Sequence, residues 1–110
     1  MGIPTKGSIV LIRFPFSDLT KLKLRPALVI AKTNKNDFIL CQITSKEYGD
    51  FYTVKLVEND FKIGSLNKES YVRYTKLFTA NNSIIISNLA KLKEKKFDDI
   101  INSLTNFLKN

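Results

Sequence analysis

The chain has 110 residues, 44% of them hydrophobic, which is enough for one hydrophobic core and too short for two ordinary domains. Eighteen lysines and arginines against ten acidic residues give a net charge of +8, which favours a polyanionic partner but also occurs where lysines serve only solubility. The chain has no histidine, so we exclude histidine-dependent zinc sites, Ser-His-Asp and Cys-His nucleophiles, and paired-histidine ribonuclease chemistry.

The same composition bounds localisation and redox chemistry. No apolar run approaches the roughly 20 residues that a membrane helix needs, and residues 1–6 lack the apolar core of a signal peptide. We therefore expect a soluble cytoplasmic protein with no membrane partner, made of a single domain over residues 1–110. Cys41 is the only cysteine and lies in an apolar run, so a buried core residue is favoured over a nucleophile.

Short apolar runs rich in β-branched residues predict strands in the first half of the chain. The first two cover residues 8–12 and 27–30, and the polar loop between them ends in Arg25-Pro26. A turn at 33–37 leads to a third strand at 38–43, and a loop at 44–50 leads to a fourth at 52–56. Residues 58–67 are polar and contain Gly64, so we expect a loop there.

In the second half, residues 71–74 and 76–79 predict one long strand or two short ones, followed by a turn at Asn81-Asn82. Residues 84–86 are apolar, and 89–92 predict a last short strand. From Lys93 the apolar period becomes helical, and we interpret the charged run 91–96 as the polar start of this helix. Its apolar stripe contains Phe97, Ile100, Ile101, Leu104, Phe107 and Leu108. The whole pattern predicts a small, mainly β, barrel-like domain closed by a C-terminal amphipathic helix.

Arg25 is the most informative polar residue of this predicted sheet. Its planar donor fork stands where the first loop meets the second strand, and the loop carries Lys21 and Lys23. Such a fork at the base of a basic loop suits a phosphate-handling site. The alternative is a structural arginine that forms a salt bridge or anchors the loop through carbonyl groups.

Three stretches of the chain resemble the MazF/PemK toxins, in the order in which that family has them. The first contains Gly7-Ser8-Ile9-Val10-Leu11-Ile12, Phe14-Pro15-Phe16-Ser17-Asp18 and Arg25-Pro26-Ala27-Leu28-Val29-Ile30. The second is Gln42-Ile43-Thr44-Ser45, and the third joins Ser70-Tyr71-Val72 to Lys76-Leu77-Phe78-Thr79. The resemblance extends over nearly the whole chain, up to the final helix. Where Phe78 stands, the family usually carries a basic residue, and this departure bears on base preference.

The resemblance implies a fold, an activity and partners. The fold is a dimeric, SH3-like antiparallel β-barrel, also found in the gyrase poison CcdB. The activity is a metal-independent endoribonuclease, the toxin of a type II toxin-antitoxin pair, without cofactor or metal. The implied partners are single-stranded RNA, a second copy of the chain and an acidic antitoxin laid across the basic cleft, with operator DNA bound only through the antitoxin complex.

Metal-free cleavage of RNA proceeds by attack of the 2′-hydroxyl on the neighbouring phosphate, which leaves a 2′,3′-cyclic phosphate and a 5′-hydroxyl. It needs charge stabilisation at phosphorus and proton transfer at both ends. The resemblance assigns Arg25 and Thr44 as the catalytic pair. Asp18 is the nearest candidate to accept the 2′-hydroxyl proton, although an aspartate there also suits a turn.

The remaining predicted site residues bind the strand. Phe16 stands on the first loop and is the best candidate for stacking on a base. The others contact phosphates or shape the loops: Ser17, Lys21, Lys23, Pro26, Ser45 and Lys46. For Thr44 and Ser45 the alternative is a turn in which the hydroxyls satisfy nearby backbone groups.

Two other function classes stay open at this stage. A non-catalytic nucleic-acid-binding barrel would share the charge and the fold without cleaving RNA. A gyrase poison of the CcdB type acts by protein contact and ranks last, because the chain contains no tryptophan of the kind that this mode uses near the C-terminus.

Overall fold

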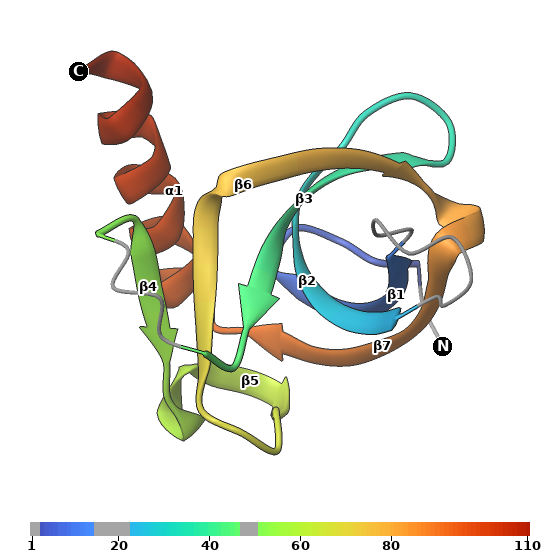
Figure 1. Cartoon of the computed structure of the whole chain (residues 1–110), viewed down its shortest axis with the longest axis horizontal. Helices are drawn as coiled ribbons and strands as arrows, with labels where there is room; N and C mark the ends of the chain where they lie inside the picture. Colours follow the sequence, from blue (N-terminus) through green and yellow to red (C-terminus); the bar gives the residue numbers. More distant parts are fainter. Residues whose placement is uncertain (1–2, 15–22, 47–50) are drawn as a thin grey trace.

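The computed structural model describes residues 3–14, 23–46 and 51–110, which form a curled antiparallel sheet with a C-terminal helix (Figure 1). The strands in these ranges are β1 (Ser8–Phe14), β2 (Lys23–Lys32), β3 (Asp37–Thr44), β4 (Thr53–Leu56), β5 (Phe61–Gly64), β6 (Ser70–Asn81) and β7 (Ile85–Leu92). Their order across the sheet is β4-β6-β3-β2-β1-β7-β5, and each neighbouring pair is antiparallel. The predicted mainly β fold with a terminal helix is confirmed.

Two buried clusters explain why the central strands are apolar at nearly every position. Successive side chains of a strand point to opposite faces, so a strand covered on only one face alternates polar and apolar residues. Here the pair Ile9 and Leu28 belongs to one cluster, and the next pair, Val10 and Ala27, belongs to the other. Both faces of β1 and β2 are therefore covered, which makes these strands a firm support for the residues at their ends.

Helix α1 (Glu94–Lys109) covers one of these clusters, as the helical period from Lys93 predicts. Ile100 and Leu104 are its buried residues, and each buried aliphatic side chain contributes about 1.5–3 kcal/mol. The last residues of the predicted apolar stripe do not pack on the sheet: Phe107 and Leu108 are 39% and 66% exposed. The Phe107 ring instead contacts Tyr52, with the ring centroids 4.8 Å apart. No helix within the described residues has the length and apolar character to span a membrane.

The prediction of a loop over residues 58–67 is wrong in its first part. Residues Glu58–Asp60 form a short 3₁₀ helix, η1, and β5 follows it and pairs with β7. Gly64 permits this pairing, because its φ is +69° and a Cβ there would stand 2.5 Å from the Leu89 carbonyl oxygen. The strand was missed because it is short and mostly exposed, so its position depends on β7 more than on its own apolar pattern.

The second half also differs from the prediction in its boundaries. β6 is one long strand whose register with β3 shifts, so that Cys41 pairs with Leu77 while Gln42 pairs with Arg73. A short 3₁₀ helix, η2 (Asn82–Ile84), replaces the predicted turn, and one strand, β7, joins the two apolar stretches that follow. Lys91 does not begin the helix, because its pairing with Ser8 keeps it in the sheet.

Candidate functional site

Arg25 lies within a strand rather than at the end of a loop. β2 begins at Lys23, two residues earlier than Arg25, and Arg25 pairs with Ile12 of β1. The side chain is exposed, and among the described residues no carboxylate forms an ion pair with it. The structural alternative, an arginine held in a salt bridge, therefore has no support in the described part of the chain. Pairing with β1 on one side holds the backbone of Arg25, and the pairing of β2 with β3 begins two residues later, at Ala27.

A surface hollow of about 290 Å³ joins Arg25 to three other parts of the chain, and we call it the Arg25 hollow. It brings Arg25 and Pro26 together with Ser45, which follows directly on β3. The opposite wall comes from the segment between β5 and β6, residues 65–69, which we call the β5–β6 loop. The lining residues are Leu24, Arg25, Pro26, Ile43, Ser45, Leu66, Asn67, Lys68, Ser70 and Leu89.

The charged side chains that line the Arg25 hollow are both positive. Arg25 and Lys68 are its ionisable lining residues within the described chain, and neither forms a described ion pair. The guanidinium offers up to five N–H donors and the ammonium three, while the Ser45 hydroxyl adds another donor. Such a set can hold an anionic oxygen and stabilise charge that develops on it.

Thr44 is the last residue of β3 and pairs with Tyr71, but it does not line the Arg25 hollow. Its Oγ1 atom accepts a hydrogen bond from the Lys46 backbone N–H, at 3.1 Å. The local turn considered for this hydroxyl is therefore present. The bond uses Oγ1 as an acceptor, so the hydroxyl hydrogen can still be donated to a ligand.

The other predicted site residues are distributed unevenly. Lys46 is exposed beyond Ser45, and Lys23 is exposed at the start of β2 opposite Phe14, so Lys23 belongs to the strand and not to the loop as predicted. Neither lysine lines the Arg25 hollow. Four predicted residues lie outside the described ranges: Phe16, Ser17, Asp18 and Lys21.

Two findings concern residues that sequence reasoning weighed differently. Asn67 and Lys68 face the Arg25 hollow but were not singled out, and the signal that pointed to them was the polar stretch after Gly64. Phe78, at the position where relatives are usually basic, pairs with Leu40 and packs its ring on Phe14, with the centroids 4.9 Å apart. Phe78 thus packs against the buried cluster that contains Val10 and Ala27, which we call the inner cluster.

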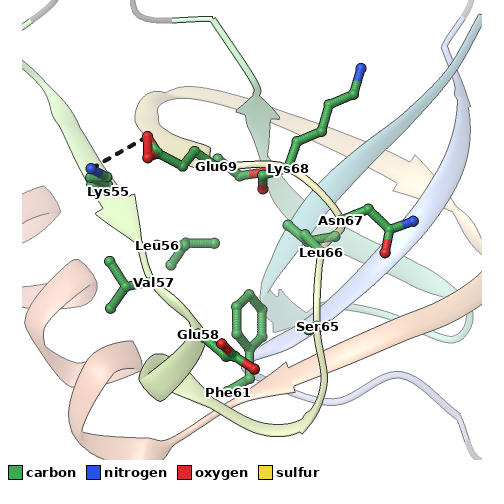
Figure 2. A pocket seen from close by; sticks show the side chains of 11 residues that line it. Lys55, Leu56, Val57, Glu58, Phe61, Ser65, Leu66, Asn67, Lys68 and Glu69 are labelled. Atoms are coloured by element: carbon green, nitrogen blue, oxygen red, sulfur yellow. Dashed lines mark hydrogen bonds and ion pairs between the residues drawn. The ribbon is translucent and has the colours of Figure 1, made fainter.

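A second hollow, of about 390 Å³, lies on the other side of the β5–β6 loop (Figure 2). We call it the Glu58 hollow. Leu66, Asn67, Lys68 and Ser70 line both hollows, so this loop is their common wall. At one end Lys55 and Glu69 form an ion pair of 3.4 Å, and at the other end Glu58 lies near the ring of Phe61.

Cys41 takes no part in either hollow. It is fully buried within β3, and burial raises the pKa of its thiol from the ordinary 9.0 to about 12. A thiol with such a pKa stays protonated at neutral pH, so the predicted core role is supported. Within the described residues, no three His, Cys, Asp or Glu side chains gather as a metal-binding group.

The fold and the Arg25 hollow define a small curled β-sheet protein with a basic depression between two strands and a loop. A family model described as PemK-like, MazF-like toxin of type II toxin-antitoxin system matches residues 5–108, and the chain belongs to this family. The resemblance found in the three sequence motifs is therefore confirmed.

Solved structures with the same fold extend over almost the entire chain. MazF from Deinococcus radiodurans is 20% identical, with 100% of both chains covered and a TM-score of 0.74. An endoribonuclease in complex with its cognate antitoxin, from a mycobacterial species, is 14% identical, with 96% of this chain and 95% of that chain covered and a TM-score of 0.75. At such identities the likeness shows the fold alone. Among curated proteins, no sequence is similar enough to count as a match.

Proposed function

We propose that this toxin is a metal-independent endoribonuclease that cleaves single-stranded messenger RNA at selected sequences. The observation that carries the proposal is the Arg25 hollow, where an exposed arginine without a described ion-pair partner meets Ser45 and Lys68. An unneutralised guanidinium on a firm strand is suited to bind a phosphodiester and to stabilise the additional charge of a phosphorane. Membership of the toxin family supports the same activity.

In the proposed reaction the 2′-oxygen attacks the adjacent phosphorus while the bond to the 5′-oxygen breaks. The products are a 2′,3′-cyclic phosphate and a 5′-hydroxyl, so one proton leaves the 2′-hydroxyl and one is taken up by the 5′-oxygen. Arg25 binds the non-bridging oxygens, and the Thr44 hydroxyl donates to the same phosphate group. Asp18 is the proposed proton acceptor, on sequence grounds alone.

The strand is held by the rest of the site. Lys23 and Lys46 are exposed near the two ends of β2 and β3 that meet at the hollow, where they add positive charge for the RNA backbone. Pro26 and Ser45 form part of the hollow itself. Phe16, Ser17 and Lys21 complete the proposed set from the first loop, with Phe16 stacking on a base.

We also propose that the chain forms a homodimer and is inhibited by an acidic antitoxin. An acidic segment complements a chain of net charge +8 and can displace RNA from a hollow lined by Arg25 and Lys68. One of the similar structures is an endoribonuclease bound to its cognate antitoxin, which supports this partner class. Operator DNA would be reached only through such a complex.

The test compares cleavage of a long single-stranded RNA, in the presence of a chelator, by wild type and by Arg25→Ala. Removing one preorganised donor of this kind lowers a rate by about a hundredfold to a thousandfold. Arg25→Lys keeps the charge but loses the two-pronged geometry, so it should restore only part of the rate. Lys32→Ala is the charge control, because it removes a cation seven residues further along β2, roughly 20 Å away.

Two results would reject the proposal in different ways. An unchanged rate for Arg25→Ala removes this residue from the mechanism. If wild-type protein binds RNA tightly and in a salt-sensitive manner but never cleaves it, the protein is a non-catalytic nucleic-acid-binding barrel instead.

A further inference from the structure

The two hollows on either side of the β5–β6 loop differ in charge. The Arg25 hollow presents Arg25 and Lys68 and no described carboxylate. The Glu58 hollow presents the carboxylates of Glu58 and Glu69 together with the ammonium groups of Lys55 and Lys68, so its charges balance. RNA has anionic phosphates and neutral bases. The Arg25 hollow, with its excess of positive charge, therefore suits the backbone, and the charge-balanced Glu58 hollow suits a base.

Only one of the two carboxylates in the Glu58 hollow is unneutralised. Glu69 is paired with Lys55, at 3.4 Å, whereas no described cation pairs with Glu58. A carboxylate that is not paired with a cation can accept several hydrogen bonds from a ligand. With two lysines and two glutamates, this hollow lacks the positive excess that favours an acidic antitoxin at the other one.

The backbone at Glu58 is held in place by its short helix, while the side chain is exposed. The Val57 backbone N–H donates to the Asp60 carboxylate at 2.8 Å, and the same carboxylate pairs with Lys96 of α1 at 3.3 Å. The Phe61 N–H donates to the Glu58 carbonyl, which closes the turn. The backbone that carries Glu58 is thereby tied to the main helix, although the segment is short and lies at the surface.

Phe61 supplies the apolar part of the same hollow. Its ring is half-buried and packs on the cluster beneath α1, together with Leu66 from the β5–β6 loop. In Figure 2 the ring stands upright between the side chains of Leu56 and Leu66, at the end of the hollow where Glu58 lies. An aromatic ring can stack on an unpaired base, and a carboxylate beside it can accept hydrogen bonds from the N–H groups of that base.

We propose that the Glu58 hollow binds a guanine base of the RNA, next to the phosphate held at Arg25. This inference rests on the proposed function. Guanine is the base whose pairing edge has two adjacent N–H donors, from N1 and from the 2-amino group, and a carboxylate can accept both. Adenine, cytosine and uracil each offer an acceptor beside their donor, which a carboxylate repels. The hollow's volume of about 390 Å³ is within the usual range of about 300–1,000 Å³ for small-ligand sites.

The experiment uses short single-stranded RNAs in which a 2′-O-methyl group at the cut site prevents cleavage. Sites cut in a long RNA are mapped first, and guanine should be enriched at a position flanking the cut. Replacing this guanine by inosine removes only the 2-amino donor. For wild type we expect roughly tenfold weaker binding, in fluorescence anisotropy, and up to a hundredfold for adenine.

Three variants test which residues of the Glu58 hollow bind the base and select guanine. Glu58→Gln should bind the guanine and inosine RNAs equally, because the amide is no longer a double acceptor. Glu69→Gln is the matched control on the same hollow, and it should keep the wild-type preference. Phe61→Leu should weaken all the RNAs by about tenfold through lost stacking and retain the preference for guanine.

The possible results separate this inference from the proposed function. RNA that is cleaved without a guanine preference, or a preference that survives in Glu58→Gln, overturns the inference alone. RNA that is bound with this preference but never cleaved overturns only the proposed cleavage. Absence of RNA binding overturns both. If Glu58→Gln changes affinity for an acidic antitoxin peptide and leaves RNA unaffected, the hollow belongs to the antitoxin and not to a base.

Discussion

The interior of the curled sheet and its Arg25 hollow are built on opposite principles. In the interior the large apolar side chains are packed against one another, and residues such as Leu40 and Val29 are fully buried. In the hollow, Arg25 is exposed, and no described carboxylate neutralises Arg25 or Lys68. Apolar packing stabilises the fold, while unneutralised charge stabilises nothing until a ligand arrives. The difference predicts that stability and activity can be changed separately.

The largest change in stability should come from Leu40→Ala. Leu40 is 0% exposed and lies in the inner cluster, between Val29 and Phe78 on the neighbouring strands. Truncating such a residue costs about 2–5 kcal/mol, because contacts are lost and a cavity remains. Urea unfolding measures this cost, and RNA cleavage measured where the variant is fully folded should be near the wild-type rate.

Leu77→Ala is the control for this truncation. It removes the same atoms from β6, but Leu77 is 40% exposed, so its cost should be under about 1 kcal/mol. If folded Leu40→Ala instead loses cleavage as severely as Arg25→Ala does, the interior and the hollow are not separable, and the comparison between them is wrong.

Gly64→Ala should come next, because Gly64 lies where the interior gives way to the β5–β6 loop. The positive φ alone costs an alanine about 1–3 kcal/mol, and the 2.5 Å approach to the Leu89 carbonyl forces the backbone to shift. The shifted loop carries Lys68, so we expect a higher KM for RNA with a smaller change in kcat. Arg25 itself should be little affected, because β7 is the partner of β5 among the described strands and β2 is not.

Gly7→Ala separates strain from collision in this experiment. Gly7 also has a positive φ, of +88°, but the nearest atom to its added Cβ, in the ring of Phe97, is 3.7 Å away. This variant should lose stability from backbone strain and keep its KM. Equal KM values for the two glycine variants would show that the β5–β6 loop does not position the RNA.

These two regions also differ in how far the sequence predicts them. The strands and the helix follow from local apolar periods, and residues such as Ile100 were assigned to the buried face correctly. The hollow combines β2, the end of β3 and a loop some forty residues after Arg25, so a local polar pattern can indicate the loop but cannot place Lys68 beside Arg25. Arg25 was proposed from its place at the base of a basic loop, and the family resemblance added Thr44 to it as a catalytic pair; Ser45 was named with Thr44 and lines the same hollow as Arg25.

β5 shows the physical limit of local prediction most clearly. Phe61 and Ile63 are its apolar residues, and Ile63 is 64% exposed. The strand therefore has only a weak apolar pattern by which it could be predicted. Its place depends on pairing with β7 and on the conformation that Gly64 allows. Both are tertiary effects, which override the polar composition from which a loop was predicted.

The prediction with the smallest effect near neutral pH concerns the pH dependence of stability, which tests whether water is excluded from Cys41. Burial raises the pKa of this thiol in the folded protein to about 12, above the 9.0 expected when the chain unfolds. The unfolded thiol therefore loses its proton first as the pH rises. The stability linked to this group is complete below pH 9 and declines toward pH 12, by at most about 1.4 kcal/mol per pH unit.

Cys41→Ala isolates this contribution from the lysines and tyrosines that titrate in the same range, since the chain has no other cysteine. The free energy of unfolding of wild type, followed by urea titration from pH 8 upward, should fall more steeply above pH 9 than that of Cys41→Ala. Ser45→Cys in the Cys41→Ala background moves the thiol to the exposed Arg25 hollow. The free energy of unfolding of this variant should follow that of Cys41→Ala above pH 9, and its thiol should react readily with iodoacetamide. Parallel curves for wild type and Cys41→Ala would mean that solvent reaches β3, because only an interior closed to water keeps a thiol protonated when its unfolded form is not.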